Sequence, residues 1–324
     1  MNSRERFRGV SRGLKVDRIP LFEEEIREEV LAAWHLQGLN RRVILENYRH
    51  FFAVERLEYI YLWFEPRPGA LGEEADFRRI EEGYRNDLPE FRCPRYWQEK
   101  AHEYASRDFP LGVSGWRGFM LPLFSREREW DSLQDVLLGL YDHPGLVQSA
   151  LSLVAECHME TIRLALRYLD FDFGVLLEPI ASPAGPLISP QMFREFVLPH
   201  YRQIVDFFHQ NGIGTVLFRS MCDVGPLLPS IVEAGVDGFW IGQVHGVVDY
   251  LELRRQYPNL LLVGGIDALA LLRDRRAISQ EVGRQVPTLL DGGRYLPGLD
   301  DRPRENIPYQ NYLHFRRALQ DCLT

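Results

Sequence analysis

The chain has 324 residues, enough for one large α/β domain or two small ones, with 45% hydrophobic and 26% charged residues, a balance typical of folded domains with a substantial core. Its formal net charge of −8 offers no general attraction to nucleic acid or to an anionic membrane, and no run reaches the ~20 apolar residues that span a bilayer. The four cysteines lack paired spacing and the start lacks a signal-like apolar stretch, so we expect a reduced, cytoplasmic protein.

The first half of the chain mixes predicted strands, helices and irregular stretches. Ser3 is the expected N-cap of a basic helix that ends near Gly13, and an irregular excursion is expected at about 67–100. Short apolar runs predict strands at residues 18–22, 57–64 and 109–115. Apolar residues at helical spacing predict helices at residues 26–36, 132–141 and 144–168.

Strands and helices alternate regularly from Phe173 onward. Strands are expected at residues 173–177, 215–218, 238–241, 260–263 and 294–297. Each is followed by a helix, at residues 190–210, 224–234, 248–256, 268–290 and 308–323. About eight such units fit a parallel (β/α)₈ TIM-type barrel, which we expect to form one domain over residues 1–324. An open doubly wound sheet is the alternative, although no Gly-x-Gly-x-x-Gly turn follows a strand.

The stretch at residues 215–226 is the centre of the predicted site. A short apolar run is followed at once by Arg219, Cys222 and Asp223, and then by a helix that opens at Pro226. In parallel α/β folds the carboxyl ends of the strands carry the chemistry, so we expect these three side chains to face it.

Other polar residues follow the remaining predicted strands, and in a barrel they converge on the same mouth. We expect catalytic roles for Glu23, Glu178, Arg219, Cys222, Asp223 and His245. Substrate contacts are expected from Trp63, Trp116, Arg117, Gln243, Asp267 and Asp301. Glu24, Glu65 and Asp300 also lie at strand ends.

Several of these residues have a structural alternative. Glu178 is either a functional acid or the partner of an arginine, and Asp267 is either an N-cap or a ligand contact. Cys222 is either an inert buried thiol or a thiolate favoured by Arg219. His245 is either a hydrogen-bonded structural residue or a participant in chemistry.

The position of Arg219 indicates an anionic partner more strongly than the positions of the other candidates indicate a function. A guanidinium directly after a buried strand costs several kcal/mol in desolvation unless an anion meets it. An internal carboxylate such as Glu178, or a substrate carboxylate, would do so. Glu23 begins an acidic run, 23–25, that could also form a solvated first helical turn.

The chain resembles the uroporphyrinogen decarboxylase superfamily, which also includes corrinoid-linked methyltransferases. The resemblance rests on segments at residues 4–7, 16–20, 185–196, 198–201, 223–224, 227–229, 233–237, 264–267 and 292–297. It implies a distorted (β/α)₈ barrel over nearly the whole chain.

Two departures from that pattern bear on activity. Porphyrinogen decarboxylases of this superfamily carry an arginine-rich segment after the first strand, where residues 22–26 here are acidic. Its zinc-dependent methyltransferases carry His-x-Cys after the central strand and a Cys near the last strand. Arg219 and Met221 stand at the first two positions here, and Asp300 and Asp301 at the third, so we expect no zinc site.

The resemblance therefore favours methyl transfer between a small substrate and a corrinoid or thiol acceptor. Glu178 and Glu23 would act as acids or bases, Arg219 would hold a substrate carboxylate, and Cys222 or His245 would handle protons or the methyl group. No motif indicates a resident cofactor; a corrinoid would be carried by a partner protein, and a homodimer is left open. The alternatives are a cofactor-free decarboxylase, with Arg219 and Arg117 as anchors, and an inactive barrel that serves as a binding subunit.

Overall fold

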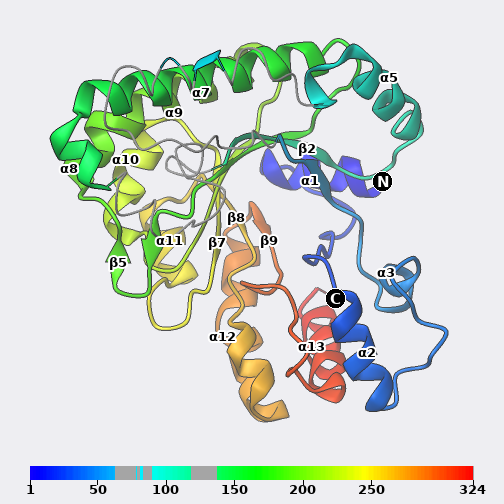
Figure 1. Cartoon of the computed structure of the whole chain (residues 1–324). Coiled ribbons are helices and arrows are strands. Elements are labelled where there is room, and N and C mark those ends of the chain that lie inside the picture. Colours follow the sequence, from blue (N-terminus) through cyan, green and yellow to red (C-terminus); the bar gives the residue numbers. More distant parts are fainter. Residues whose placement is uncertain (63–77, 79–80, 83–89, 118–136, 324) are drawn as a thin grey trace.

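A computed structural model describes residues 1–62, 78, 81–82, 90–117 and 137–323, with the backbone alone described for residue 90 and residues 115–117 (Figure 1). Within this part of the chain no helix is long and apolar enough to cross a membrane.

A curled, parallel seven-stranded sheet forms the centre of the molecule (Figure 1). Its strands pair in the order β1-β2-β3-β6-β7-β8-β9, and every neighbouring pair is parallel. They are β1 (Glu58–Ile60), β2 (Leu111–Arg117), β3 (Phe173–Leu177), β6 (Val216–Met221), β7 (Gly238–Gly242), β8 (Leu261–Val263) and β9 (Tyr295–Leu296). A small antiparallel pair, β4 (Ala181–Ser182) and β5 (Gly185–Pro186), follows β3. The predicted parallel α/β organisation is confirmed.

Helices connect the strands and pack outside the sheet (Figure 1). The α-helices are α1 (Ser3–Ser11), α2 (Glu28–Leu36), α3 (Tyr48–Phe51), α5 (Pro94–Glu103), α7 (Pro144–Ala165), α8 (Pro190–Met192), α9 (Leu198–Gln210), α10 (Leu228–Glu233), α11 (Tyr250–Gln256), α12 (Arg275–Asp291) and α13 (Tyr309–Asp321). Short 3₁₀ segments are η1 (Glu90–Arg92), η4 (Gly225–Leu227) and η5 (Ala268–Leu272), and a π-helical turn, η3 (Phe193–Val197), joins α8 to α9.

Alternate residues of each strand face two different hydrophobic clusters. Phe173, Val175 and Leu217 belong to an inner cluster on the concave face of the sheet. Leu176 and Phe218, one residue out of phase, belong to the larger cluster between the sheet and the helices. Because side chains alternate along a strand, this phase fixes which polar residues at the strand ends point inward.

Helix α1 lies across the amino-terminal ends of the strands. Phe7 belongs to the inner cluster, and the backbone N–H of Arg4 donates to the carbonyl of Asp108 at 2.8 Å, just before β2. At the other end of the helix, Arg294 donates to the carbonyl of Ser11 at 3.2 Å. The helix therefore spans from β2, next to one edge of the sheet, to β9 at the other edge.

Some predicted elements differ from the structure for local reasons. The strand expected at 18–22 contributes one parallel bridge, from Phe22 to Glu55, because Pro20 has no N–H to donate. The N-cap of α1 is Asn2, not Ser3, and it forms a capping box with Glu5.

Two further predictions need correction. Much of the excursion expected at 67–100 lies outside the described residues, but residues 94–103 form helix α5, which has Pro94 at its first position and buries Trp97. The helix expected at 190–210 is interrupted by η3. Pro199 lacks the N–H that a regular α-helix would use there, and the wider turn accommodates it.

Candidate functional site

A cavity of about 390 Å³ lies at the carboxyl ends of β6, β7, β8 and β9. Five predicted site residues line it: Cys222, Gln243, His245, Asp267 and Asp301. Asp300, Arg302 and Arg304 line it as well. The expectation that these strand ends meet at one place is therefore correct for the second half of the sheet.

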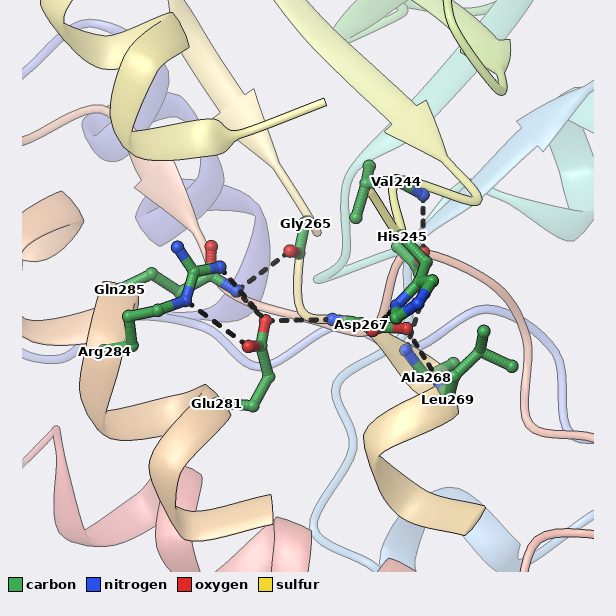
Figure 2. A network of polar contacts seen from close by, with 10 residues as sticks. Val244, His245, Gly265, Asp267, Ala268, Leu269, Glu281, Arg284 and Gln285 are labelled. Carbon is green, nitrogen blue, oxygen red and sulfur yellow. Dashed lines mark hydrogen bonds and ion pairs between the residues drawn. The ribbon is translucent and has the colours of Figure 1, made fainter. Parts of the chain in front are cut away.

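His245 and Asp267 form a hydrogen-bonded pair at this cavity (Figure 2). Nδ1 of His245 lies 2.5 Å from Oδ2 of Asp267, and this contact raises the pKa of the imidazole above 6.5. The same carboxylate accepts from the N–H of Leu269 at 2.9 Å, so the predicted capping role of Asp267 is confirmed. Gly264 allows close packing before Asp267, because it has φ +81° and a Cβ there would lie 3.0 Å from the carbonyl oxygen of Leu299.

Cys222 and Gln243 adopt left-handed backbone conformations side by side. Their φ angles are +65° and +51°, which few non-glycine residues adopt. The thiol of Cys222 donates to Oε1 of Gln243 at 3.3 Å, and burial raises its pKa. Of the two alternatives for Cys222, this favours the buried thiol over a thiolate stabilised by Arg219, because desolvation opposes the thiolate.

Cys222 should consequently react slowly with alkylating agents. At pH 8 we expect iodoacetamide to modify the exposed Cys93 first and Cys222 at least about tenfold more slowly, because only the thiolate reacts and burial limits access. Peptide mass spectrometry over a time course measures both rates in one sample. Modification of Cys222 as fast as Cys93 would contradict this description of the thiol.

Arg219 points into the inner face of the sheet, where its partner is Glu24. The two side chains form an ion pair and are 16% and 14% exposed. The guanidinium also donates to the hydroxyl of Tyr59 and lies 4.3 Å from the ring centroid of Trp240. Burial lowers the pKa of Arg219 to about 10, so it remains a cation at neutral pH. Its charge is thus met within the chain.

Glu178 does not meet Arg219 as expected. The backbones are adjacent, since the N–H of Glu178 donates to the carbonyl of Arg219 at 2.8 Å. Glu178 nevertheless has the phase of Leu176, and its carboxylate accepts from the hydroxyl of Tyr201 on α9 at 2.8 Å. The residue is 1% exposed and lies on the helix side of the sheet. It does not line the cavity, in contrast to the predicted role.

Glu23 likewise lies on the helix side. Its carboxylate accepts from the hydroxyl of Tyr312 at 3.2 Å and lies 3.7 Å from Arg316, both on α13. Burial raises the pKa of Glu23 to about 7. Asp223 closes a turn by accepting from the N–H of Gly225 at 3.0 Å. Neither residue lines the cavity at the strand ends.

The structure does not describe the side chains of the three remaining predicted contacts. Trp63 is outside the described residues, and Trp116 and Arg117 end strand β2 with their side chains undescribed.

Three residues that matter to the site were given no catalytic or substrate-binding role from the sequence, although two of them were placed at strand ends. They are Glu24, Asp300 and Arg302. Glu24 could have been found by counting the inward phase from Phe22, which lies in the inner cluster two residues earlier. From the sequence, the segment at residues 302–304 was expected to be either a solvated loop or the source of a phosphate or carboxylate contact, and the structure places Arg302 at the cavity.

The donor atoms at the central strand do not suit a zinc ion. Arg219 and Met221 stand where the resemblance given above places two zinc ligands, and the Cys222 thiol is engaged by an amide. Among the described residues no group of three or more His, Cys, Asp or Glu side chains is arranged to hold a metal. We therefore derive no chemistry through zinc.

Comparisons with known proteins add independent information. The sequence model of the uroporphyrinogen decarboxylase (URO-D) family matches residues 132–297. A uroporphyrinogen decarboxylase from Pelobacter propionicus is 27% identical over 159 residues, covering 47% of this chain and 43% of that protein. A chloroplastic uroporphyrinogen decarboxylase from Nicotiana tabacum is 26% identical over 151 residues, covering 46% and 37% respectively. These matches span less than half of either relative.

A solved structure resembles the chain over its whole length. A methyltransferase from Methanosarcina mazei superposes with a TM-score of 0.65 over 99% of both chains, with 14% sequence identity. At this identity the likeness concerns the fold.

Proposed function

The chain belongs to the uroporphyrinogen decarboxylase family, and within that family we propose that it transfers a methyl group from a small anionic substrate to a corrinoid or thiol acceptor. The observation that carries the proposal is the His245–Asp267 pair in the cavity at the strand ends, with the cation of Arg302 on the same wall. The methyltransferase with the same overall fold supports it.

His245 supplies a proton in this proposal. A heteroatom that carries a methyl group is a poor leaving group unless it is protonated as its bond to the methyl carbon breaks. Asp267 favours the imidazolium form of His245, which has Nε2–H available to the leaving heteroatom. The heteroatom keeps the electron pair of the broken bond and takes this proton, while the acceptor supplies the pair for the new bond to the methyl group.

Arg302 supplies the anchor for an anionic group on the substrate. Its backbone N–H donates to Asp301 at 2.9 Å, whereas its guanidinium has no hydrogen bond or ion pair with the described residues. It also lies near enough to Arg219 to lower the pKa of that residue. A cation at a cavity wall without a matching carboxylate is suited to bind one from a substrate.

Porphyrinogen decarboxylation is disfavoured by the same charges. A porphyrinogen with many carboxylates needs several uncommitted cations, but Arg219 is matched by Glu24 and Arg304 lies 2.5 Å from Asp301. Asp267 and Asp300 also line the cavity. A substrate with one anionic group fits this balance better.

A closed barrel would complete the site. The bridge from Phe22 to Glu55 lies just before β1, and a Cβ on Gly298, just after β9, would be 3.3 Å from the carbonyl oxygen of Phe22. The segment at Phe22 therefore lies near both edges of the seven-stranded sheet, which supports closure there. Glu24, two residues on, would then meet Arg219 across the interior.

Replacement of His245 by glutamine tests the proposal. Methyl transfer from a panel of methylated small acids to a free corrinoid or thiol should fall about 10²–10⁴-fold in kcat, since glutamine cannot be protonated. The alkaline limb of the wild-type pH profile should lie above pH 6.5, because activity requires imidazolium. His209→Gln is the matched control, since His209 pairs with Asp237 at 2.8 Å on the exposed side of α9. Methyl transfer by His245→Gln at the wild-type rate would exclude the proposed acid.

Decarboxylation of a small acid is the second candidate, favoured by the two curated relatives. Carbon dioxide release from the same panel without methyl transfer would support it. Neither activity with any panel member would favour a binding subunit without catalysis.

A further inference from the structure

Asp300 joins the loops that carry the two members of the His245–Asp267 pair. Its Oδ2 accepts from the N–H of Val244, the residue before His245, at 2.8 Å. Its Oδ1 accepts from the N–H of Ala268, the residue after Asp267, also at 2.8 Å. One carboxylate therefore fixes the backbone beside both members of the pair.

The backbone of Asp300 is held against the same two strands. Its N–H donates to the carbonyl of Ile266 at 2.9 Å, just beyond β8. Its carbonyl oxygen packs on Gly242 at the end of β7, where a Cβ would approach to 2.6 Å. Asp300 is 6% exposed, so the position of its carboxylate is determined by packing as well as by hydrogen bonds.

We propose that Asp300 is a positioning residue that holds His245 and Asp267 in hydrogen-bonding register through the backbone N–H groups of Val244 and Ala268. The proposal deepens the proposed function, since it concerns the geometry of the same proton donor. Asp300 acts through the loops and does not itself transfer the proton.

A second network of polar contacts also holds the loop after β8. On the other side of Asp267, its N–H donates to Glu281 of α12 at 3.3 Å, a longer contact than either bond to Asp300 (Figure 2). Glu281 is in turn held at 2.7 Å by Gln285, which also donates to the carbonyl of Gly265 at 2.9 Å. This second network fixes the loop after β8 and reaches the end of the loop after β7 only through the half-exposed Arg284, which lies 3.5 Å from Glu281 and 3.6 Å from Asp249. Asp300 supplies the shorter and more buried connection between the two loops.

The charge on Asp300 adds a dependence on pH. The charged and titratable groups that face it are Asp267 and His245 on the joined loops, Asp301 beside it and Tyr250 on α11. Burial, aided by the charges of Asp267 and Asp301, raises the pKa of Asp300 to about 6, although the N–H groups of Ala268 and Val244 act in the opposite direction. Protonation turns one of the two acceptor oxygens into a hydroxyl, so the tether weakens as the pH falls through about 6.

Asp300→Asn provides the test, read by NMR without any substrate. Asparagine keeps the shape but presents an N–H₂ group to one of the two backbone N–H groups. Amide exchange at Val244 or Ala268 should accelerate on the order of tenfold or more. The wild type should show an Nδ1–H signal of His245; in Asp300→Asn this signal should broaden or disappear, and the pKa of His245 should move down toward 6.5.

Two further variants define the outcomes. Asp267→Asn should abolish the histidine signal while leaving the amide protection at Val244 intact, and Asp274→Asn, on the exposed N-cap of α12, should change neither. Unchanged amide exchange in Asp300→Asn would overturn the proposal. So would a lower pKa of His245 with its Nδ1–H signal retained, because Asp300 would then act by charge alone. Since no turnover is measured, either result is independent of whether methyl transfer is the activity.

Discussion

Replacement of Asp172 by asparagine is expected to lower the free energy of unfolding by about 3–5 kcal/mol, the usual cost of leaving buried charges without their partner. The carboxylate of Asp172 is fully buried, and it accepts hydrogen bonds from Nε of Arg4 at 2.8 Å and from Nε of Arg8 at 2.5 Å. Arg107 lies 3.7 Å away, and the N–H of Leu111 donates to the same carboxylate at 3.0 Å. One side chain thus attaches α1 to the start of β2 and compensates several cations.

Urea denaturation at pH 7 measures this effect. Asp170→Asn is the matched control, because Asp170 is exposed and contributes its backbone carbonyl to Arg107. Adding Arg8→Gln to Asp172→Asn should restore part of the loss, since one fewer guanidinium is then uncompensated. A loss below about 1 kcal/mol in Asp172→Asn would show that α1 is held mainly by the packing of Phe7.

The second large effect is a dependence of stability on pH that Glu23→Gln should remove. Burial raises the pKa of Glu23 from 4.5 to about 7 in the folded chain. The folded state therefore binds this proton more tightly, and the contribution to stability is full below pH 4.5 and lost as the pH rises through about 7. Between pH 5 and pH 8 the wild type should lose about 2–3 kcal/mol relative to Glu23→Gln.

Denaturation of both proteins at pH 5 and pH 8 gives this difference directly. The glutamine can still accept from the hydroxyl of Tyr312, so the packing on α13 is preserved. Glu25→Gln, exposed and two residues further on, should follow the wild type at both pH values. Parallel behaviour of Glu23→Gln and the wild type would mean that Glu23 is ionised throughout this range.

The sequence predicted the regular part of the fold because its signals are local. The strand at 173–177 is an apolar run between turns, and the structure has it with the same ends. The interruption at residues 193–197 was not predicted, since it depends on how Pro199 is accommodated within a helix that packs on the sheet. The bridge at Phe22 depends on distant neighbours, which a short apolar run does not specify.

The sequence correctly predicted how far along the strands Arg219 and Glu178 lie, but not the face of the sheet from which each side chain projects. The expectation placed Arg219 and Glu178 at the same level, and their backbones are indeed paired. Their side chains leave the sheet on opposite faces, because one residue separates their phases. The cavity instead gathers residues from loops after β7 to β9, such as His245 and Asp300, whose loop conformations no periodic pattern describes.

The alternation of Glu23 and Glu24 between two layers has a consequence for fidelity of folding. If the segment were threaded one residue out of step, Glu24 would reach Tyr312 and Arg316, and Glu25 would reach Arg219. Because three glutamates stand in a row, Arg219 and Arg316 would each meet a carboxylate in either alignment. The ion pairs therefore do not distinguish the correct alignment from the shifted one. The apolar residues beside them must therefore select the correct alignment, because the same shift would move Phe22 out of the inner cluster.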